Sequence, residues 1–444
     1  MILPEEFIQQ TKAMMGDELF HTFLSGLNEE PSVSIRFNPS KPINPQPSTF
    51  NPQPSTLNST PSLTGRDGVG LPIPWCSTGY YLNERPAFTF DPLLHAGAYY
   101  VQEASSMFLE RVMQEYITES VCMLDLCAAP GGKSTLARTL LSSDSLLVSN
   151  EPIRNRAQIL SENVQKWGYP QHIVTNNYPK DFRKAKLLFD VILTDVPCSG
   201  EGMFRKDEGA IREWSPKNVE HCWQLQREIV SDIWKCLRPG GILIYSTCTF
   251  NTKENEENVR WIAEELGADI LPVATEDSWG ITGSLLKGFD EPVYRFIPGK
   301  TRGEGLFMAV LRKHGDRETR RQGDKECVSR FTREKEGARK QESLLKSIKT
   351  LNIIPSDFIE SLRQAQDAPH AELSYEQAIA YLRREAIVLP AETPRGIVVV
   401  TYQQLPLGLV KNIGSRANNL YPKEWRIKST HIPEIESHYL NFKL

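Results

Sequence analysis

Two cysteines follow apolar runs that have the length of buried strands. Cys198 lies just beyond FDVILTD (189–195), which ends in Asp195, and Cys248 ends GGILIYSTC (240–248). A deprotonated thiol is a strong nucleophile, and a covalent intermediate splits one difficult reaction into two easier steps. Either cysteine alone would more often be a small packing residue. Two of them at the predicted carboxyl ends of strands in one sheet indicate a reactive site.

A turn of small residues in MLDLCAAPGGKSTLA (123–137) indicates a second functional element. Gly131 and Gly132 allow backbone amides to approach a ligand closely, and the helix start that follows favours a negative group. A phosphate-binding P-loop is excluded, because it needs glycine where this chain has Cys127. The turn also lacks the G-x-G-x-x-G pattern of dinucleotide sites. The remaining candidate is a methyl-donor site that holds the carboxylate end of a methionine moiety.

An acid follows the next predicted strand. SLLVSNE (145–151) ends in Glu151, which is suited to hold ribose hydroxyls of such a donor. Taken alone, Glu151 is equally well explained as an acid at a helix N-terminus. Its position after the glycine turn favours the ligand role.

A methyl-donor turn beside two cysteines suits methylation of cytosine at carbon 5. That carbon is a poor nucleophile until a thiolate adds to carbon 6, after which carbon 5 can attack a methyl sulfonium. Asp195 is placed to assist the addition by protonating or hydrogen-bonding the base. A base must then remove the proton from carbon 5, and the second cysteine is a candidate for promoting release.

These residues require a scaffold that gathers the ends of several strands. From about 97 to 312, short apolar runs alternate with helix-like stretches, which predicts a doubly wound, mostly parallel α/β sheet of the Rossmann-like kind. Ligands of such sheets bind outside the carboxyl ends of the strands, where the residues above lie. The predicted strands are 121–127, 145–151, 172–176, 189–195 and 240–248.

The rest of the chain differs in composition. Residues 4–27 predict a helix and 32–38 a strand, whereas 39–66 carry a tandem repeat rich in Pro, Ser, Thr and Asn. We interpret that repeat as a flexible surface insertion without a function. Residues 314–343 are highly charged and predict a linker or an exposed helix, and a separate region begins near 344.

The 444 residues carry a formal net charge of −4, which alone argues against a nucleic-acid binder. The charge is uneven, because residues 311–350 contain 13 Lys and Arg against 7 Asp and Glu. RNA contact and a solvated linker explain that stretch equally well. No apolar run approaches about 18 residues and no signal peptide is evident, so we expect a cytoplasmic protein without a membrane span.

The eight cysteines include no C-x-x-C pair, so a zinc ribbon or redox motif has no support and we expect no metal site. Reduced thiols are favoured over a disulfide framework in a chain of this length without an export signal. We interpret six of the eight as buried packing residues.

The motifs together resemble those of the Sun-type RNA cytosine-5 methyltransferases. The matching residues are APGGK, DVPCSGEG and YSTCT, with YYVQEASSM (99–107) before them, and the likeness spans roughly residues 30–313. In addition, LPLGLVKNIGSRANNLYPKEWRI (405–427) is similar to the C-terminal region of the small-subunit ribosomal RNA methyltransferase F type, which carries a PUA-like RNA-binding module.

The resemblance implies a role for each residue of the site. Cys248 falls on the nucleophile and Cys198 on the cysteine that assists product release, while the cofactor is S-adenosylmethionine. The family usually has an acid near the end of the third strand that contacts adenine, and this chain has Asn177 and Tyr178 there. The implied cofactor contacts are Cys127, Ala128, Ala129, Pro130, Gly131, Gly132, Lys133, Glu151, Asn177, Tyr178 and Asp195.

The resemblance also implies RNA contacts and a division of the chain. Arg36 and Asn38 match a motif near the family's RNA-binding face, and Arg205 and Lys206 are candidates for phosphate contact; a solvated surface charge explains each equally well. The expected parts are an N-terminal RNA-binding α+β domain (1–96), a methyltransferase domain (97–313), the charged linker (314–343) and a PUA-like RNA-binding region (344–444).

The implied substrate is RNA, with small-subunit ribosomal RNA or the small ribosomal subunit favoured, and we expect a monomer. Transfer RNA is an alternative substrate. A DNA cytosine methyltransferase would use the cysteine of the PC motif as its nucleophile and would not need Cys248. A catalytically idle RNA-binding assembly factor is the non-enzyme alternative, although Cys248, Cys198 and Asp195 are all present.

Overall fold

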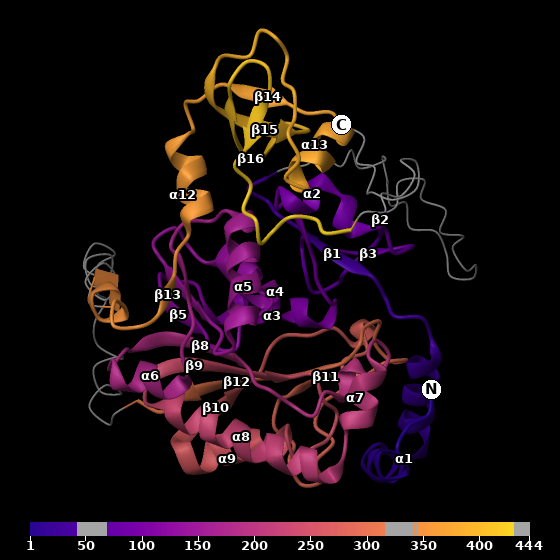
Figure 1. Ribbon diagram of the computed structural model, residues 1–444. Helices are drawn as coiled ribbons and strands as arrows, with labels where there is room; N and C mark the ends of the chain where they lie inside the picture. The colour runs from indigo at the N-terminus through magenta and orange to yellow at the C-terminus, as the bar shows by residue number, and fades with distance from the viewer. Residues whose placement is uncertain (42–68, 316–340, 343, 430–444) are drawn as a thin grey trace, which may run out of the picture.

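A computed structural model describes residues 1–41, 69–315, 341–342 and 344–429 (Figure 1). Most of the predicted surface insertion, 39–66, and of the charged linker, 314–343, lies outside the described residues. Among the helices that are described, none is both long and apolar enough to cross a membrane.

The N-terminal helix packs on loops that belong to the middle of the chain. Helix α1 (Glu5–Asn28) is interrupted at Gly16, whose φ of 75° lies in the left-handed region. The ring of Phe7 contacts that of Phe204 at 5.1 Å between centroids, and the ring of Phe23 contacts that of Phe250 at 4.9 Å. Since Phe204 and Phe250 follow the two candidate cysteines, α1 covers the loops that carry them.

A small antiparallel sheet with the strand order β2-β3-β1-β4 follows α1. Its strands are β1 (Ser34–Phe37), β2 (Val69–Pro72), β3 (Gly79–Leu82) and β4 (Tyr99–Val101), and η1 (Phe88–Phe90) and α2 (Pro92–His95) lie between β3 and β4. The predicted strand 32–38 is therefore confirmed as β1.

Arg36 and Asn38, which match a motif near the family's RNA-binding face, are both buried, so neither is a solvated surface residue and neither side chain is exposed to RNA. The guanidinium of Arg36 donates to Thr135 Oγ1 at 2.6 Å and lies 4.4 Å from the ring centroid of Trp167. The amide of Asn38 donates to the carbonyl of Trp167 at 3.0 Å. Both residues fasten the N-terminal sheet to the central domain, a role that depends on partners about a hundred residues away.

The central sheet is confirmed as doubly wound, but the expectation that it is mostly parallel is wrong, because four of its strand pairs in the described residues are parallel and four are antiparallel. In the described part of the chain it has nine strands, with the order β10-β12-β9-β8-β5-β6-β7-β13 and β11 paired to β12. The five predicted strands are the parallel ones: β5 (Cys122–Asp125), β6 (Leu146–Asn150), β7 (His172–Thr175), β8 (Phe189–Asp195) and β9 (Leu237–Thr247). Four antiparallel strands extend it: β10 (Ala268–Leu271), β11 (Tyr294–Phe296), β12 (Leu306–Lys313) and β13 (Ile353–Ile354).

Helices cover both faces of this sheet, as its apolar strands require. Met123 and Leu124 are neighbours in β5, yet they belong to different apolar clusters on opposite faces. The helices are α3 (Leu109–Tyr116), α4 (Gly132–Leu140), α5 (Arg154–Trp167), α6 (Pro179–Lys184), α7 (Glu208–Glu213), α8 (Pro216–Trp234) and α9 (Glu256–Trp261).

The strand order reverses at β5, which has β6 on one side and β8 on the other. Such a switch point opens a crevice at the carboxyl ends of the strands, because the following connections leave toward opposite faces. The turn 126–131 leaves β5 at this crevice, and the loop of Cys198 leaves β8 beside it.

A smaller unit follows the linker and lies above the N-terminal sheet in Figure 1. It contains α12 (Asp357–Gln364), α13 (Tyr375–Leu382) and a four-stranded sheet of β14 (His370–Glu372), β15 (Gly396–Tyr402), β16 (Leu405–Asn412) and β17 (Ala417–Asn419). Leu93 and Tyr99 of the N-terminal part share one apolar cluster with Tyr381 and Val400 of this unit. The two terminal parts of the chain therefore pack as one body.

Candidate active site

A cleft of about 360 Å³ lies at the carboxyl ends of β5, β8 and β9. It is lined by the turn after β5, by the ends of β8 and β9, and by residues of the N-terminal part and the loop before β12. The wall residues that carry charged or thiol groups are Glu103, Asp125, Cys127, Lys133, Asp195, Lys206, Cys248 and Glu304.

The turn between β5 and α4 forms one wall of this cleft, with Cys127, Ala128, Ala129, Pro130, Gly132 and Lys133 facing it. Gly131 has a φ of 118°, which a side chain would strain, and a Cβ there would meet Leu160 at 3.2 Å. Glycine is therefore required to turn the chain into α4, whose first residues, Gly132 and Lys133, line the cleft.

Asp125 is a site residue that the sequence analysis missed. It is fully buried at the end of β5, and its Oδ2 accepts a hydrogen bond from Ser134 Oγ at 2.6 Å. Its Oδ1 has no hydrogen-bond partner among the described residues although it is buried. Burial raises the pKa of Asp125 to about 7. An acid at the last position of the strand before the glycine turn was the signal that could have identified it.

Asp195 is held by two donors at the end of β8. Lys133 Nζ donates to its Oδ2 at 2.9 Å and Ser246 Oγ donates to its Oδ1 at 2.7 Å. Burial alone would lower the pKa of Lys133, but the Asp195 carboxylate outweighs it and the pKa is raised. Lys133 therefore stays protonated and keeps Asp195 in a fixed orientation beside the cleft.

The two cysteines predicted to react are in contact. Cys198 Sγ lies 3.2 Å from Cys248 Sγ, both are free thiols, and Cys248 faces the cleft. The hydrogen bond to Cys248, together with burial, raises the pKa of Cys198 well above its ordinary value. Cys198 therefore keeps its proton at neutral pH and can donate it toward the sulfur of Cys248.

The remaining cysteines differ in how deeply they are buried. Cys76, Cys122, Cys222 and Cys236 are buried, as expected for packing residues, whereas Cys127 is partly exposed and faces the cleft. The eighth cysteine, at position 327, lies outside the described residues. In the described part of the chain, no group of three His, Cys, Asp or Glu residues is arranged to hold a metal ion.

Glu151, Asn177 and Tyr178 do not face the cleft. Glu151 is buried, and its Oε1 accepts a hydrogen bond from the amide of Ile153 at 2.9 Å, the geometry of an acid at a helix start. The side chain of Asn177 donates to the carbonyl of Asn352 at 3.2 Å, and Tyr178 is 60 % exposed. The structure therefore gives the expected adenine contact no geometric support.

Arg205 and Lys206 have different roles from each other. The side chain of Arg205 is 5 % exposed, and it donates to Glu304 Oε2 at 2.8 Å and to the carbonyl of Gly26 at 2.8 Å. The expectation that Arg205 contacts phosphate is therefore wrong, because its charge ties α1 to the loop before β12. Lys206 lines the cleft, its side chain is 35 % exposed, and its Nζ lies 3.7 Å from Glu304 Oε1.

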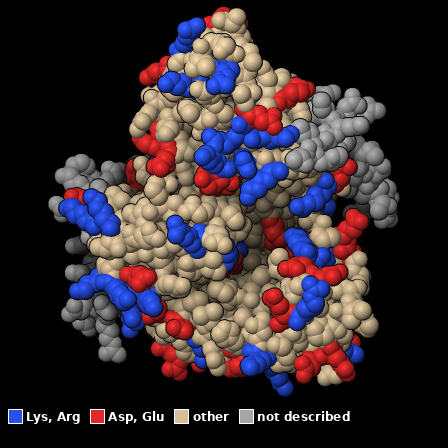
Figure 2. Space-filling model, viewed as in Figure 1, with Lys and Arg blue, Asp and Glu red and all other residues tan. Residues whose placement is uncertain are grey.

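A second concave surface, which we call the basic hollow, lies on the C-terminal unit. It has a volume of about 740 Å³ and is lined by Arg383, Arg384, Lys423, Glu424, Arg426 and Lys428. All six of these residues are exposed or partly exposed. Figure 2 shows Lys and Arg side chains gathered on this unit above a hollow in the middle of the same face.

Comparison with known proteins gives consistent matches along the chain. The model described as "N-terminal domain of 16S rRNA methyltransferase RsmF" matches residues 3–104, "16S rRNA methyltransferase RsmB/F" matches 113–312, and "Methyltransferase RsmF PUA domain" matches 368–427. Ribosomal RNA small subunit methyltransferase F of Cronobacter sakazakii is 30 % identical over 80 % of this chain and 84 % of its own length. The protein of that name from Escherichia coli O127:H6 is 28 % identical over 95 % of this chain and 96 % of its own length.

Solved structures support the fold. The structure of NSun6 from Pyrococcus horikoshii with SFG matches with a TM-score of 0.55 and 20 % identity over 70 % of this chain and 99 % of that chain. A methyltransferase homolog protein from the same organism matches with a TM-score of 0.55 and 22 % identity over 70 % of this chain and 100 % of that chain.

Proposed function

This chain belongs to the family of ribosomal RNA small subunit methyltransferase F, and we propose that it methylates carbon 5 of a cytosine in small-subunit ribosomal RNA through a covalent adduct at Cys248. Proteins of this family depend on S-adenosylmethionine. The observation that carries the proposal is the contact between the sulfurs of Cys198 and Cys248 at 3.2 Å, beside a cleft that the glycine turn lines.

The cleft fits S-adenosylmethionine by its chemistry. The buried Oδ1 of Asp125 is an acceptor in need of a donor, which the ammonium group of a methionine moiety offers. The turn that ends at Gly132 presents backbone amides at the start of α4, which suit the carboxylate of the same moiety. When bound, the cofactor supplies an electrophilic methyl group on a positively charged sulfur, and Asp125 and Asp195 provide negative charge nearby.

Cys248 then acts on the base. As a thiolate its sulfur adds to carbon 6 of cytosine, which gives carbon 5 the electron density needed to attack a methyl group. The S–H of Cys198 stabilises negative charge on Cys248 Sγ before the attack. Asp195 hydrogen-bonds the base, and Lys133 and Ser246 hold its carboxylate in the orientation this requires.

Cys198 acts after the methyl group has arrived. Bond formation to carbon 6 removes the charge from the sulfur of Cys248, and with it the largest cause of the raised pKa of Cys198. Cys198 then gives up its proton to water in the open cleft, and its thiolate takes the proton from carbon 5. Loss of that proton expels Cys248 from carbon 6 and releases the methylated base.

The terminal parts of the chain hold the RNA in this proposal. The basic hollow brings five Lys and Arg side chains together with a single acid, a composition that suits the phosphates of RNA. We assign RNA binding to the N-terminal part (1–96) and the C-terminal region (344–444), and the chemistry to residues 97–313. The target cytosine must be unstacked to reach Cys248, which favours an accessible loop of the RNA.

The test is methyl transfer to small ribosomal subunits and to naked ribosomal RNA from cells that lack the protein, followed by bisulfite mapping. One newly protected cytosine, lost with Cys248→Ala, is the expected result. Methylation of a base other than cytosine, or of DNA in preference to RNA, would contradict the proposal.

A further inference from the structure

Each of the two cysteines is followed by a buried glutamate. Glu201 comes three residues after Cys198, and Glu254 comes six residues after Cys248. Their side chains are 1 % and 0 % exposed, and the described residues offer neither of them a cationic partner within ion-pair distance. Buried carboxylates without a counter-ion are costly unless hydrogen bonds satisfy them, so their partners indicate why they are there.

Glu201 binds the loop of the other cysteine. Its Oε2 accepts hydrogen bonds from the backbone amides of Phe250 at 2.6 Å and Asn251 at 3.0 Å, which lie just beyond Cys248. Its Oε1 accepts from Trp214 Nε1 at 2.9 Å. A carboxylate from the Cys198 loop thus fixes the backbone that follows Cys248.

Glu254, which belongs to the loop of Cys248, binds the loop of Cys198. Its Oε2 accepts a hydrogen bond from the backbone amide of Ser199 at 3.0 Å, next to Cys198, and another from Gln226 Nε2 at 2.7 Å. Gln226 also donates to the carbonyl of Pro197 at 2.8 Å, so Cys198 is held on both sides. A carboxylate from the Cys248 loop thus fixes the backbone around Cys198.

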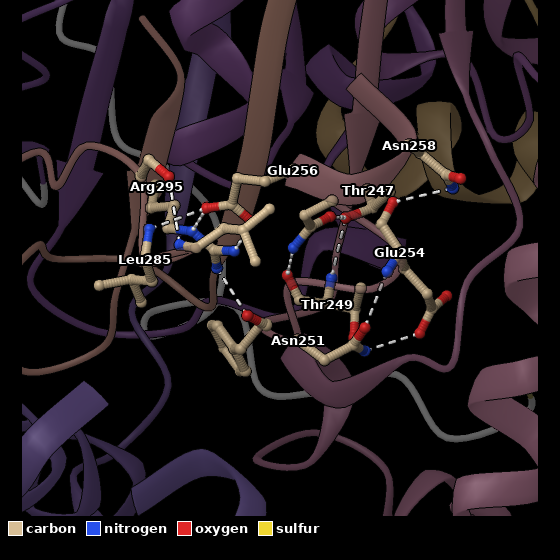
Figure 3. A network of polar contacts seen from close by, with 12 residues as sticks. Thr247, Thr249, Asn251, Glu254, Glu256, Asn258, Leu285 and Arg295 are labelled. Carbon is tan, nitrogen blue, oxygen red and sulfur yellow. Dashed lines mark hydrogen bonds and ion pairs between the residues drawn. The ribbon is translucent and has the colours of Figure 1, made fainter. Parts of the chain in front are cut away.

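Asn251 joins the two glutamates. Its Nδ2 donates to Glu201 Oε1 at 3.1 Å and to Glu254 Oε1 at 2.7 Å, while its Oδ1 accepts from the amide of Glu254 at 2.9 Å. Figure 3 shows the side chains of Asn251 and Glu254 pointing toward each other, with Thr249 nearby. Burial, and less strongly the charge of Glu201, raise the pKa of Glu254, and the donors around it act in the opposite direction.

Two further contacts tie the loops together. The amide of Gly202 donates to the carbonyl of Cys248 itself at 2.7 Å, and the hydroxyls of Ser199 and Thr249 lie 2.9 Å apart. The positions of both cysteine sulfurs are therefore set by bonds that cross from one loop to the other.

We propose that Glu201, Asn251 and Glu254 form a carboxylate brace of positioning residues, which keeps the sulfur of Cys198 beside that of Cys248 during the reaction. The inference rests on the proposed function. The brace touches neither substrate nor cofactor in this role. It acts through the two cysteines, and its loss impairs release more than attack, because in release the sulfur of Cys198 must reach carbon 5 while Cys248 is bonded to carbon 6, whereas in attack Cys198 only supports the charge on Cys248.

Glu254→Gln tests the brace with little change in volume. Both carboxylate oxygens accept hydrogen bonds, so an amide nitrogen at either position faces another donor. We expect turnover to fall roughly tenfold or more. The fraction of protein recovered covalently bound to RNA under denaturing conditions should rise several-fold, as it should with Cys198→Ala. Glu201→Gln carries the same expectation from the other loop and replaces Glu254→Gln if that variant is unfolded.

Glu110→Gln is the matched control. Glu110 is also buried, and it accepts from the amide of Ser77 at 3.0 Å and from Cys76 Sγ at 3.1 Å, in a part of the molecule that holds neither cysteine loop. This variant should lower the unfolding temperature without changing the adduct fraction.

Two results would overturn the inference. Glu254→Gln with normal turnover would show that the brace is not needed, and lost turnover with an unchanged adduct fraction would reduce it to a structural role. If Cys198→Ala traps the adduct while Glu254→Gln does not, the brace fails and the proposed function stands. If Cys198→Ala traps nothing, the proposed release role itself fails.

Discussion

The active-site cleft and the basic hollow are built from different kinds of residue, because covalent chemistry and attraction to phosphate make different demands on side chains. At the cleft, Cys248 contacts Cys198 behind it and Asp195 contacts Lys133, each at a fixed distance. In the basic hollow, Lys423 and its neighbours are open to solvent. Covalent chemistry fails when atoms are misplaced by about 1 Å, whereas attraction to phosphate acts over about 10 Å and is screened by salt. Substitutions in the cleft should therefore change reaction rates, whereas substitutions in the basic hollow should change the salt dependence of RNA binding.

Cys248→Ala should give the largest effect. Without the nucleophile, methyl transfer should fall by at least about a thousandfold, and no RNA adduct should form. Transfer of a labelled methyl group measures this. Cys222→Ala, which removes a buried packing cysteine of α8, is the control and should keep most of the activity. Activity retained by Cys248→Ala would show that another residue attacks the base.

Cys198→Ala should separate attack from release. A first round of methylation should proceed, but turnover should fall about a hundredfold, because the adduct at Cys248 is not resolved. Denaturing electrophoresis should show protein attached to RNA in near-stoichiometric amount. The control is Cys236→Ala, since Cys236 is buried far along the chain from the Cys198 loop and precedes β9. An adduct-free Cys198→Ala protein would remove this cysteine from the release step.

The pKa of Asp125 predicts how binding of S-adenosylmethionine depends on pH. Below pH 7 the buried carboxyl carries a proton that it must lose to hold an ammonium group. Affinity should therefore rise by up to about tenfold per pH unit below pH 7 and level off above it. Calorimetric titration measures this, and Asp125→Asn should bind weakly with a flat profile. A flat profile for the unaltered protein would contradict the assignment.

The same shift has an opposite consequence for stability without a ligand. Since the folded protein holds this proton up to about pH 7 and the unfolded chain loses it near its ordinary pKa of 3.8, the contribution of Asp125 to stability declines as pH rises between those values. Unfolding in denaturant, compared with Asp125→Asn across this range, isolates that contribution.

Substitutions in the basic hollow should give the smallest effect on rate. Lys423→Ala with Arg426→Ala should weaken RNA binding, and the slope of log affinity against log salt should fall by about 0.7 to 0.9 for each phosphate that is no longer neutralised. Lys12→Ala, at an exposed lysine of α1, is the control. The fraction of adduct formed at saturating RNA should not change. A changed adduct fraction would show that residues of the basic hollow affect the reaction at Cys248 as well as RNA binding.

The sequence revealed the cleft far better than the hollow. Gly131, Cys198 and Cys248 each follow a short apolar run, and strand ends are local features that a parallel sheet necessarily gathers at one edge. Arg383 and Lys423 are forty residues apart, and only the folding of the C-terminal unit brings them together. Residues separated so widely leave no pattern in the sequence that marks a common surface.

The wrong expectations about surface charges share one physical cause. The sequence suggests surface cations at Arg36 and Arg205, but each is neutralised or stacked by a partner on a distant segment, such as Trp167 or Glu304. The adenine contact expected of Asn177 stays a prediction, and its side chain donates to the carbonyl of Asn352, which comes just before β13. Periodicity and composition describe a segment, and they do not reveal which other segment will cover it.

The shared apolar cluster of the two terminal parts limits the shapes of RNA that the protein can accept. Because Leu93 and Tyr99 pack with Tyr381 and Val400, the basic hollow cannot swing freely relative to the N-terminal sheet, and Arg36 fastens that sheet to the central domain. The distance between the basic hollow and Cys248 is therefore fixed. A short oligonucleotide that carries the target base but cannot bridge this span should be a poor substrate, even when its sequence is correct. Recognition would then depend on a distance within the folded RNA as much as on the bases around the cytosine.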